Sequence, residues 1–428
     1  MTASAPSDSG LFGWWRVAEQ PARRALVASS LGWMLDAFDV MLFALATTAI
    51  IKDLGVTKAQ IGLVGSVTLL GGAVGGLTFG HIADRFGRTR ALMASVLLYS
   101  VFTALCGFAQ TLTALMVIRV LLGMGMGGEW ASAAALVSET WPAKHRGRAF
   151  GFMQGSWAIG YGAAAAVSWL VLDRFGWRVM FFVGVLPALL VFWVQRYVQE
   201  PELWRARNAE RLARRARGLP EHADGGARFG DIFRGRTALV TIAVMTMNAC
   251  TLFGWWGLNG WVPARLSLPV AQGGLGFSSG ATSALVFVMQ IGMWLGYVSF
   301  GYITDAVGRK KVYVLYLLVA AVLLPIYGAV ERPMILLLLG PLVAFFGTGF
   351  FSGFGALTAE LYPTTIRATA QGFTYNIGRI ASAAAPFTVG KLATTRGFGA
   401  AFAVIGAVYV LAALSWVWIP ETRGRALE

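Results

Sequence analysis

Long apolar stretches alternate with short polar segments along the whole chain. A helix that crosses a bilayer needs about 20 mostly apolar residues. Such stretches recur at residues 25–50, 59–80, 91–110, 112–137, 149–171, 178–198, 237–262, 280–302, 312–330, 333–357, 368–392 and 399–419. The pattern predicts an all-α membrane protein with twelve transmembrane helices, six on each side of a polar segment in the middle.

Two of the polar loops repeat each other at a fixed distance. Gly80–Arg90 reads GHIADRFGRTR and Gly301–Lys311 reads GYITDAVGRKK, and Asp84 and Asp305 are 305 − 84 = 221 residues apart. A second pair of segments, Glu139 to Arg146 and Glu360 to Arg367, keeps the same offset. The chain is therefore two homologous halves, which is how many secondary transporters place a binding site near the bilayer midplane.

The repeat and the polar middle segment together predict the domain organisation. We expect two pseudo-symmetric six-helix bundles, residues 1–198 and 237–428, joined by a cytoplasmic linker at 199–236. The linker is rich in Arg, Ala, Gly and Glu, and Glu202–Arg217 favours an amphipathic helix at the membrane surface.

Composition and charge agree with a membrane protein. Of 428 residues, 57% are hydrophobic and only 13% are charged, against about 25% charged in soluble domains. The net charge of +15 comes from Lys and Arg in alternate short loops, as the positive-inside rule requires. This distribution predicts cytoplasmic termini in a cell membrane, the inner membrane if the source is bacterial, and argues against nucleic-acid binding.

Other classes of site find little support in the residues. The first 20 residues lack the order of a signal peptide. Cys106 and Cys250 each lie inside an apolar stretch, so we expect neither a disulfide nor a metal site. A nucleophile and base set or a phosphate loop is not visible, so we expect no enzyme activity and no cofactor.

The repeated loops carry acids and bases in positions suited to ion pairs at helix ends. Such pairs can hold one conformation and release in another; the alternative is that they are solvated topology signals. The gating candidates are Asp84, Arg88, Glu139 and Arg146 in the first half and Asp305, Arg309, Glu360 and Arg367 in the second.

These loops resemble the hallmark G-x-L-a-D-r-x-G-r-k loop of the major facilitator superfamily. The resemblance covers nearly the whole chain and implies two six-helix bundles and alternating access by rocking of one bundle on the other. The first-span segment Leu35–Asp39, LDAFD, resembles the D-G-x-D signature of the aromatic-acid and sialate groups of proton symporters, with Ala37 in place of Gly. Further matches to these groups are Gly127–Trp130, Gly176–Arg178 and Phe181–Gly184.

Ionisable side chains inside a membrane span are costly, so each is a functional candidate. Asp36 and Asp39 lie about 17 to 21 Å into the first span and share one helical face. Two carboxylates in a low-dielectric site do not both ionise easily and titrate as a coupled unit. We therefore expect a proton-coupling pair; the alternative is a structural pair bridged to Arg119. Glu129 is either a second proton site or a packing anchor.

Arg379, in the eleventh span, is the candidate for an anionic cargo, because its planar fork matches a carboxylate. Asn376 and Tyr375 lie one turn away on the same face. The alternative is that Arg379 is a counter-ion for a buried acid. We assign Arg119 mainly to pairing with an acid, Asp36 or Glu129.

Aromatic and amide side chains near the same depth are candidates to shape the cavity, although Trp and Tyr often mark membrane interfaces instead. Several large rings beside one Arg suit a flat or small apolar acid. The substrate-binding candidates, besides Arg379, Asn376 and Tyr375, are Trp157, Gln154, Gln290, Trp256 and Phe38, with Trp33, Trp255 and Asn259 nearby.

These features predict a proton-coupled symporter that imports a small organic monocarboxylate, preferentially an aromatic or heteroaromatic acid of the benzoate or nicotinate kind. Its partners would be the carboxylate, protons and the lipid bilayer, and we expect a monomer. The alternatives are a lactate-like or sialate-like acid:proton symporter and a proton-driven drug exporter. A non-transporting sensor would typically carry a signalling domain.

Overall fold

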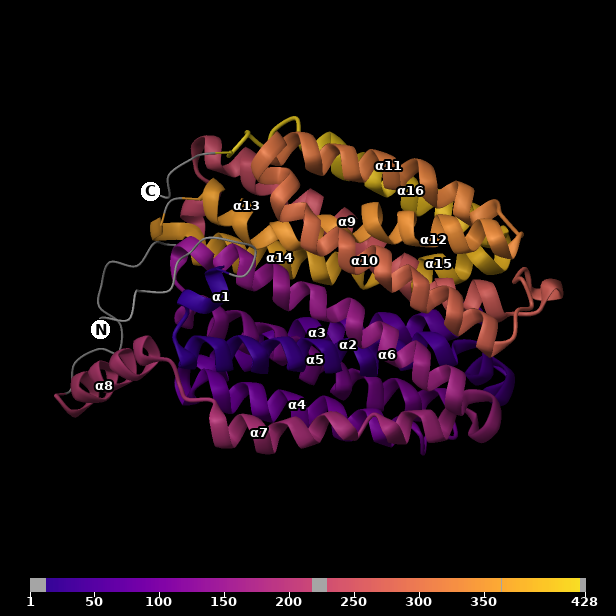
Figure 1. Cartoon of the computed structure of the whole chain (residues 1–428), viewed down its shortest axis with the longest axis horizontal. Coiled ribbons are helices and arrows are strands. Elements are labelled where there is room, and N and C mark those ends of the chain that lie inside the picture. Colours follow the sequence, from indigo (N-terminus) through magenta and orange to yellow (C-terminus); the bar gives the residue numbers. More distant parts are fainter. Residues whose placement is uncertain (1–12, 218–228, 363, 424–428) are drawn as a thin grey trace, which may run out of the picture.

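The computed structural model describes residues 13–217, 229–362 and 364–423. Every regular element in these ranges is a helix. The helices form two bundles that lie side by side, one from the first half of the chain and one from the second (Figure 1). The expected all-α architecture of two bundles is confirmed.

The first bundle is built from long helices that follow the apolar stretches. Its elements are α1 (Gly13–Val17), α2 (Gln20–Leu54), α3 (Lys58–Phe86), α4 (Arg88–Cys106), α5 (Leu112–Thr140), α6 (Ala143–Val183), η1 (Leu186–Ala188) and α7 (Leu189–Tyr197). Gly176 breaks α6 with φ 79° and ψ 171°, a conformation that glycine adopts readily. The fifth expected span therefore ends inside α6, and the sixth continues through α7.

The linker and the second bundle follow. In the linker, α8 (Glu202–Ala216) and η2 (Phe229–Phe233) are described, so the expected helix near Glu202–Arg217 is confirmed. The second bundle contains α9 (Gly235–Ser267), η3 (Val270–Gln272), α10 (Ser279–Val307), α11 (Arg309–Ala329), α12 (Pro333–Thr348), η4 (Gly349–Gly353), α13 (Phe354–Leu361), α14 (Thr364–Ser382), α15 (Ala384–Thr395) and α16 (Gly397–Ser415).

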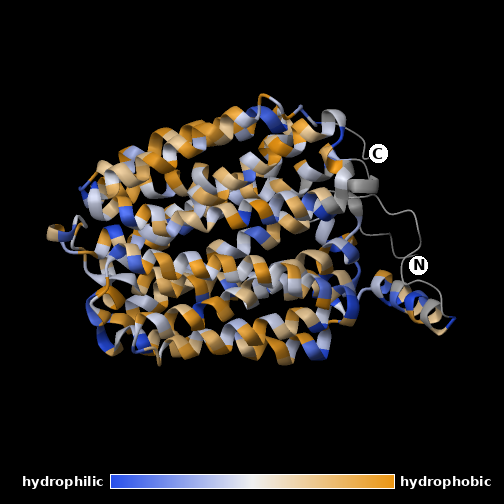
Figure 2. Cartoon of the chain, turned by 180° about the vertical axis from the view of Figure 1, so that it is seen from behind, coloured by the Kyte–Doolittle hydropathy of each residue, from blue (hydrophilic) through white to orange (hydrophobic). Residues whose placement is uncertain are grey.

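Within the described residues, ten helical stretches are long and apolar enough to cross a membrane. One of them, His145–Tyr197, is 53 residues long and holds the fifth and sixth expected spans together. The eleventh expected span is divided between α14 and α15. Hydrophilic residues gather toward the ends of the helices and on α8, whereas hydrophobic residues cover their lengths (Figure 2).

The two ends of the bundles differ in what they carry. We call the end with α8 and the loops before α4 and α11 the linker end, and the opposite end the far end. The Trp14 ring lies 5.2 Å from the Trp141 ring, and Glu421 bonds to the backbone of Arg309, so both ends of the described chain are at the linker end. Residues 1–12 and 424–428, the expected cytoplasmic termini, lie outside the described ranges.

At the far end the two halves are joined by direct hydrogen bonds. The hydroxyls of Thr48 on α2 and Ser267 on α9 lie 2.7 Å apart. The Lys58 ammonium donates to the carbonyl of Gln272 at 2.6 Å and to that of Ala393 at 3.2 Å. These contacts close the far end between the bundles.

The helices α3 and α5 approach each other through glycine. A Cβ added at Gly75 would overlap the carbonyl of Met124, and a Cβ at Gly127 would overlap the carbonyl of Gly72. Small residues allow this close backbone contact in membranes. The close contact fixes α5, which carries Arg119 and Glu129, against α3.

We expect Gly75→Leu to destabilise the protein by about 1–3 kcal/mol or more, because the side chain has to displace a backbone carbonyl. The measurement is the midpoint of thermal unfolding of purified protein. The matched control is Gly147→Leu, since a Cβ at Gly147 meets nothing within 4 Å. Equal midpoints for the two variants would contradict a tight contact between α3 and α5.

Candidate functional site

The five ionisable side chains that the sequence singled out inside the spans are all buried. Their exposed fractions are 0% for Asp36, Asp39 and Glu129, 2% for Arg119 and 4% for Arg379. They come from α2, α5 and α14, so both halves contribute. Burial of this many charged groups in a membrane span is costly unless they serve a function.

Asp36 is at the centre of this charge cluster. It interacts electrostatically with Arg379 and Arg119 and with Glu129. Among the described residues, neither of its carboxyl oxygens has a hydrogen-bond partner, and the same holds for Glu129. Two buried carboxyl groups without partners can each hold or release a proton without first breaking a hydrogen bond.

A glycine makes room for Glu129 next to Asp36. Gly32 lies one turn before Asp36 on α2, and a Cβ there would come within 2.7 Å of Glu129 Oε1. The side chain of Glu129 therefore rests against the backbone of α2. This contact brings two of the three proton-coupling candidates together.

Asp39 has a different neighbourhood from Asp36. The Thr103 hydroxyl on α4 donates to Asp39 Oδ2 at 3.0 Å, and a Cβ at Gly184 would lie 3.0 Å from Asp39 Oδ1. Asp39 therefore faces the interior of the first bundle, whereas Asp36 faces the charges contributed by both halves. Sequence reasoning did not identify Thr103, because a threonine inside an apolar helix gives no separate signal.

Arg379 reaches from the second half across to α3. Its Nη1 donates to the Gly72 carbonyl at 3.4 Å, and its guanidinium lies 5.6 Å from the centre of the Tyr375 ring. The amide of Asn376 donates to the Gly372 carbonyl at 2.8 Å. A Cβ on Gly76 would meet both Arg379 Nη1 and Asn376 Oδ1 within 3.6 Å, so the expected trio lies against the glycine face of α3.

Arg119 interacts with Asp36 and Asp39 through space rather than by a contact. Its Nε donates to the Thr68 hydroxyl at 3.3 Å, and its guanidinium lies 4.3 Å from the centre of the Phe43 ring. In the described part of the chain it forms no ion pair within 4.0 Å of a carboxylate. Pairing of Arg119 with Asp36 or Glu129 stays a prediction.

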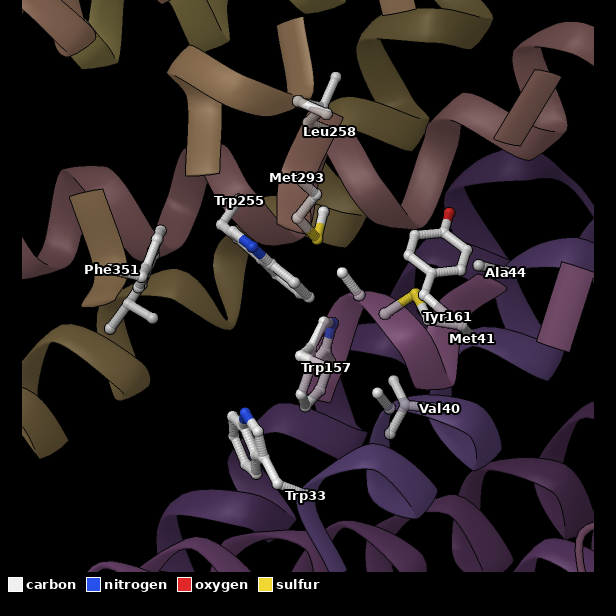
Figure 3. Close-up of a cluster of buried hydrophobic side chains, with 14 of the residues drawn as sticks. Trp33, Val40, Met41, Ala44, Trp157, Tyr161, Trp255, Leu258, Met293 and Phe351 are labelled. Atoms are coloured by element: carbon white, nitrogen blue, oxygen red, sulfur yellow. The ribbon is translucent and has the colours of Figure 1, made fainter. Parts of the chain in front are cut away.

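Aromatic rings from both halves meet beside the charges. The rings of Trp33 and Trp157 are 4.5 Å apart, and those of Trp157 and Trp255 are 5.2 Å apart. Figure 3 shows these three side chains pointing toward one another from the two bundles. Trp256 lies 4.7 Å from Trp255. Of the expected pocket residues, Trp157 and Trp256 are thus brought together.

A second aromatic contact crosses between the halves. Trp130 on α5 lies 4.7 Å from Trp33 and stacks on Tyr375 of α14 at 5.8 Å and 28°. Trp130 was not among the sequence candidates, although it directly follows Glu129. The only signal that pointed to it was the Gly127–Trp130 match.

The remaining pocket candidates are buried but less well connected. Phe38 is 7% exposed. The Gln154 and Gln290 amide oxygens are buried without a hydrogen-bond partner, while Gln290 Nε2 donates to the Val286 carbonyl at 3.2 Å. A buried amide oxygen without a partner is an acceptor that a ligand can use.

The repeated loops form matching ion-pair clusters at the linker end. Arg88 pairs with Asp84 at 2.5 Å and with Glu139 at 2.8 Å, and Arg309 pairs with Glu360 at 3.2 Å. Gly87 and Gly308, which precede the two arginines, both have φ 120°. Arg146 donates to the Trp141 carbonyl at 3.4 Å. The side chains of Asp305 and Arg367 lie outside the described residues.

The structure adds a third repeated pair to these clusters. The Glu200 carboxylate accepts from the backbone of Thr89 and Arg90 at 3.1 and 3.2 Å. The Glu421 carboxylate accepts from the backbone of Arg309 and Lys310 at 2.9 and 3.1 Å. The offset 421 − 200 = 221 equals that of the loops, and this equality was the signal that sequence reasoning missed. Both acids stabilise a helix N-terminus.

The second of these caps predicts a pH dependence of stability. Partial burial alone would raise the pKa of Glu421, but backbone donors at Arg423, Arg309, Lys310 and Thr422 hold it below the usual value of 4.5. Stabilisation by a group with a lowered folded pKa is present above the unfolded pKa and is lost as the pH falls through the folded pKa.

Glu421→Gln is therefore expected to cost about 0.5–1 kcal/mol at neutral pH. The difference from the unmodified protein should fade below about pH 4.5. The measurement is the thermal unfolding midpoint across pH. Glu19→Gln is the control, because Glu19 precedes α2 without a side-chain capping bond. A Glu421 variant indistinguishable from the control at pH 7 would contradict the cap.

Two bundles of membrane-spanning helices with a charged site between them are typical of a multi-pass membrane transporter that carries a small molecule. The comparisons with known proteins agree. The chain belongs to the Major Facilitator Superfamily, which it matches over residues 29–273 and 245–427.

Several curated relatives are similar over nearly their full length. A putative metabolite transport protein of Haemophilus influenzae is 34% identical over 97% of this chain and 98% of its own. A probable 4-methylmuconolactone transporter of Cupriavidus pinatubonensis is 31% identical over 98% and 95%. A niacin transporter of Acinetobacter baylyi is 30% identical over 93% and 94%.

Solved structures show the same fold. A D-xylose-proton symporter has a TM-score of 0.72 at 20% identity, over 94% of this chain and 99% of that chain. A proton:xylose symporter bound to 6-bromo-6-deoxy-D-glucose has a TM-score of 0.74 at 19% identity, over 95% and 97%. The solved structures thus show the twelve-helix, two-domain fold. The family match and the curated relatives confirm the family resemblance and make the chain a transporter rather than an enzyme.

Proposed function

We propose that the protein is a proton-coupled symporter that imports a small organic monocarboxylate, preferentially an aromatic or heteroaromatic acid. The observation that carries this proposal is the buried cluster of Asp36, Glu129, Arg379 and Arg119, in which acids and guanidinium groups from both halves interact and both acids lack hydrogen-bond partners. Such a cluster can take up a proton together with a carboxylate without a large change in buried charge, because the two charges cancel.

The functions of the curated relatives support an acidic cargo. They include, besides the 4-methylmuconolactone and niacin transporters, a cis,cis-muconate transport protein and a benzoate transport protein of Acinetobacter baylyi, 30% and 25% identical to this chain. A sialic acid transporter of Escherichia coli is 28% identical. Most of these cargoes are small planar acids, which fits the aromatic rings beside Arg379.

Coupling follows from the position of Asp36 between two cations. While Asp36 is ionised, it compensates Arg379 and competes with a substrate carboxylate for that guanidinium. When Asp36 is protonated, Arg379 is left uncompensated in a low-dielectric site, and a cargo carboxylate restores the balance with a charge-assisted bidentate bond. Each ligand thus raises the affinity for the other, as linkage requires.

The aromatic rings supply the second part of the site. Trp33, Trp157 and Trp255 lie edge to face or tilted against one another, and Trp130 stacks on Tyr375 one turn from Arg379. A planar acid that slides between such rings gains dispersion and stacking energy over its whole face. A bulky, hydroxyl-rich acid gains less from these walls.

Alternating access would use the contacts at the two ends. Opening of the far end requires the Lys58 and Thr48 bonds between the halves to break. At the linker end, the Arg88 and Arg309 clusters each lie within one half and would hold the helix ends of that half together as it rocks. A carrier that reorients readily only when it is empty or fully loaded couples the two fluxes.

The test is uptake into proteoliposomes with an imposed pH gradient, acidic on the side from which uptake is measured. The panel is benzoate, nicotinate, lactate and N-acetylneuraminate. We expect concentrative uptake of benzoate or nicotinate that stops when the gradient is collapsed. Uptake of N-acetylneuraminate alone would move the cargo to the sialate class, and uptake of each acid without any response to the gradient would remove the proton coupling.

A further inference from the structure

The structure contains a cavity of about 50 Å³ between the two halves, on the far-end side of the charge cluster. Its walls come from α2, α3, α5, α9 and α15, and include Phe43, Thr68, Trp256, Gly260 and Pro386. A water molecule occupies about 10–15 Å³ of such volume, so the cavity has room for about four water-sized groups. This is the size of one carboxylate group with its attached carbon.

Arg119 is the one charged residue in this wall. It is 2% exposed, and its Nη1 has no hydrogen-bond partner. Its other described contacts are the Thr68 hydroxyl, the face of Phe43 and the Cys106 thiol. A buried guanidinium with an unused N–H donor and no ion-pair partner among the described residues can bind an anion.

The guanidinium group of Arg119, which lines the cavity, and that of Arg379 are held by the same helix, α3. Arg379 bonds to the Gly72 carbonyl and Arg119 bonds to the Thr68 hydroxyl, so the two guanidinium groups are anchored one turn apart on α3. Four residues of an α-helix rise by about 6 Å. Asp36 interacts electrostatically with both groups, so its protonation would release both for other anions.

We propose that the Arg119 cavity is a second anion subsite, which receives a second acid group of the cargo while Arg379 holds the first. The preferred cargo is then a rigid diacid in place of a monocarboxylate, with its two acidic groups separated by about one helical turn. This inference rests on the proposed function, because it assumes that Arg379 binds a carboxylate. Apart from Arg119, Thr47 and Thr68, the described wall of the cavity is apolar and aromatic, so it would surround the carbon that bears the second acid group.

The probes are terephthalate and 4-carbamoylbenzoate, which have nearly the same shape but carry two carboxylates and one. Affinities are measured by isothermal titration with the purified full-length chain at one pH. We expect terephthalate to bind at least about tenfold more tightly than the amide, the effect of one additional charge-assisted bond. Arg119→Gln should bring the two affinities to within about threefold of each other. The ratio of the two affinities is the readout, because Arg119 also interacts with Asp36 and its loss can change the affinity for both probes.

A second variant keeps the charge and removes the space. A Cβ at Gly260 meets nothing within 4 Å and Gly260 lines the cavity, so Gly260→Leu should fill it and also abolish the preference for the diacid. Arg178→Gln is the matched control, since Arg178 is a partly exposed far-end residue paired with Asp53. The control should retain the full preference.

Chloride distinguishes the cargo from an inorganic anion as the source of the bound group. If chloride, compared with gluconate, stabilises the unmodified protein but not Arg119→Gln while the two probes bind equally tightly, the subsite takes an inorganic anion and the proposal for the cargo is overturned. Equal affinity for the two probes in the unmodified protein overturns the proposal, and so does equal loss of both in Arg119→Gln with an unchanged unfolding midpoint. Failure of both probes to bind, in contrast, would count against the proposed function itself.

Discussion

Asp36→Asn is expected to abolish accumulation of the acid against its gradient, while exchange of labelled for unlabelled acid across the membrane continues. Asparagine has nearly the shape of a protonated aspartic acid and no charge to lose. The variant therefore imitates the protonated carrier permanently, in which Arg379 is released from Asp36 and binds the cargo in both orientations. A carrier that cannot give up its proton cannot return empty, so net uptake should fall at least about a hundredfold.

The measurement compares concentrative uptake with exchange in the same proteoliposome preparation. Asp53→Asn is the control, since Asp53 pairs with Arg178 at the far end and should retain both activities. Asp39→Asn supplies the second comparison, because Asp39 accepts a bond from Thr103 inside the first bundle. If Asp39→Asn loses concentrative uptake but keeps exchange, and Asp36→Asn still concentrates the acid, the coupling role belongs to Asp39.

Arg379→Gln is expected to weaken binding of the acid at least about a hundredfold, equivalent to about 2.7 kcal/mol. The guanidinium would otherwise form a charge-assisted pair with the carboxylate, and a bond to a charged group in a low-dielectric site contributes about 1.5–3 kcal/mol. The measurement is the ligand-induced rise in the thermal unfolding midpoint, which follows the affinity.

Two further variants make this result specific to the carboxylate contact. Arg379→Lys keeps the charge without the planar fork, so it should recover part of the affinity. Asn376→Ala should leave the carboxylate affinity within about threefold, because the Asn376 amide already donates to the Gly372 carbonyl. An unchanged ligand response in Arg379→Gln would assign the anion to another cation.

The sequence alone predicted the buried charges and the two bundles, because each depends on local pattern. Apolar stretches of sufficient length identify the helices, and an ionisable residue in the middle of one is visible at once. The neighbours of Asp36 and Asp39 were not predictable in this way. A spacing of three places both aspartates on one helical face. However, α4 with Thr103 packs on one side of that face and α5 with Glu129 on the other. Which helix each aspartate meets depends on the packing of segments that are distant in the sequence.

Two other features escaped the sequence for similar reasons. Trp130 and Tyr375 are 245 residues apart (375 − 130), and only the arrangement of the two halves brings their rings together. Arg119 was expected to pair with an acid because a buried arginine normally needs one. That pairing stays a prediction. The position of Arg119 over Phe43 and against a cavity depends on the packing of other helices, which no local pattern records.

The contact of Lys58 at the far end is sensitive to sequence change on one of its two sides only. Its two acceptors on the other half, at Gln272 and Ala393, are main-chain carbonyls, and nearly any amino acid at these positions supplies the same oxygen. Sequence drift in that half therefore leaves the contact intact, whereas a single replacement at position 58 removes it. In a family alignment, variation should be tolerated at 272 and 393 much more than at 58, and no compensating pair of changes is needed to preserve the closure.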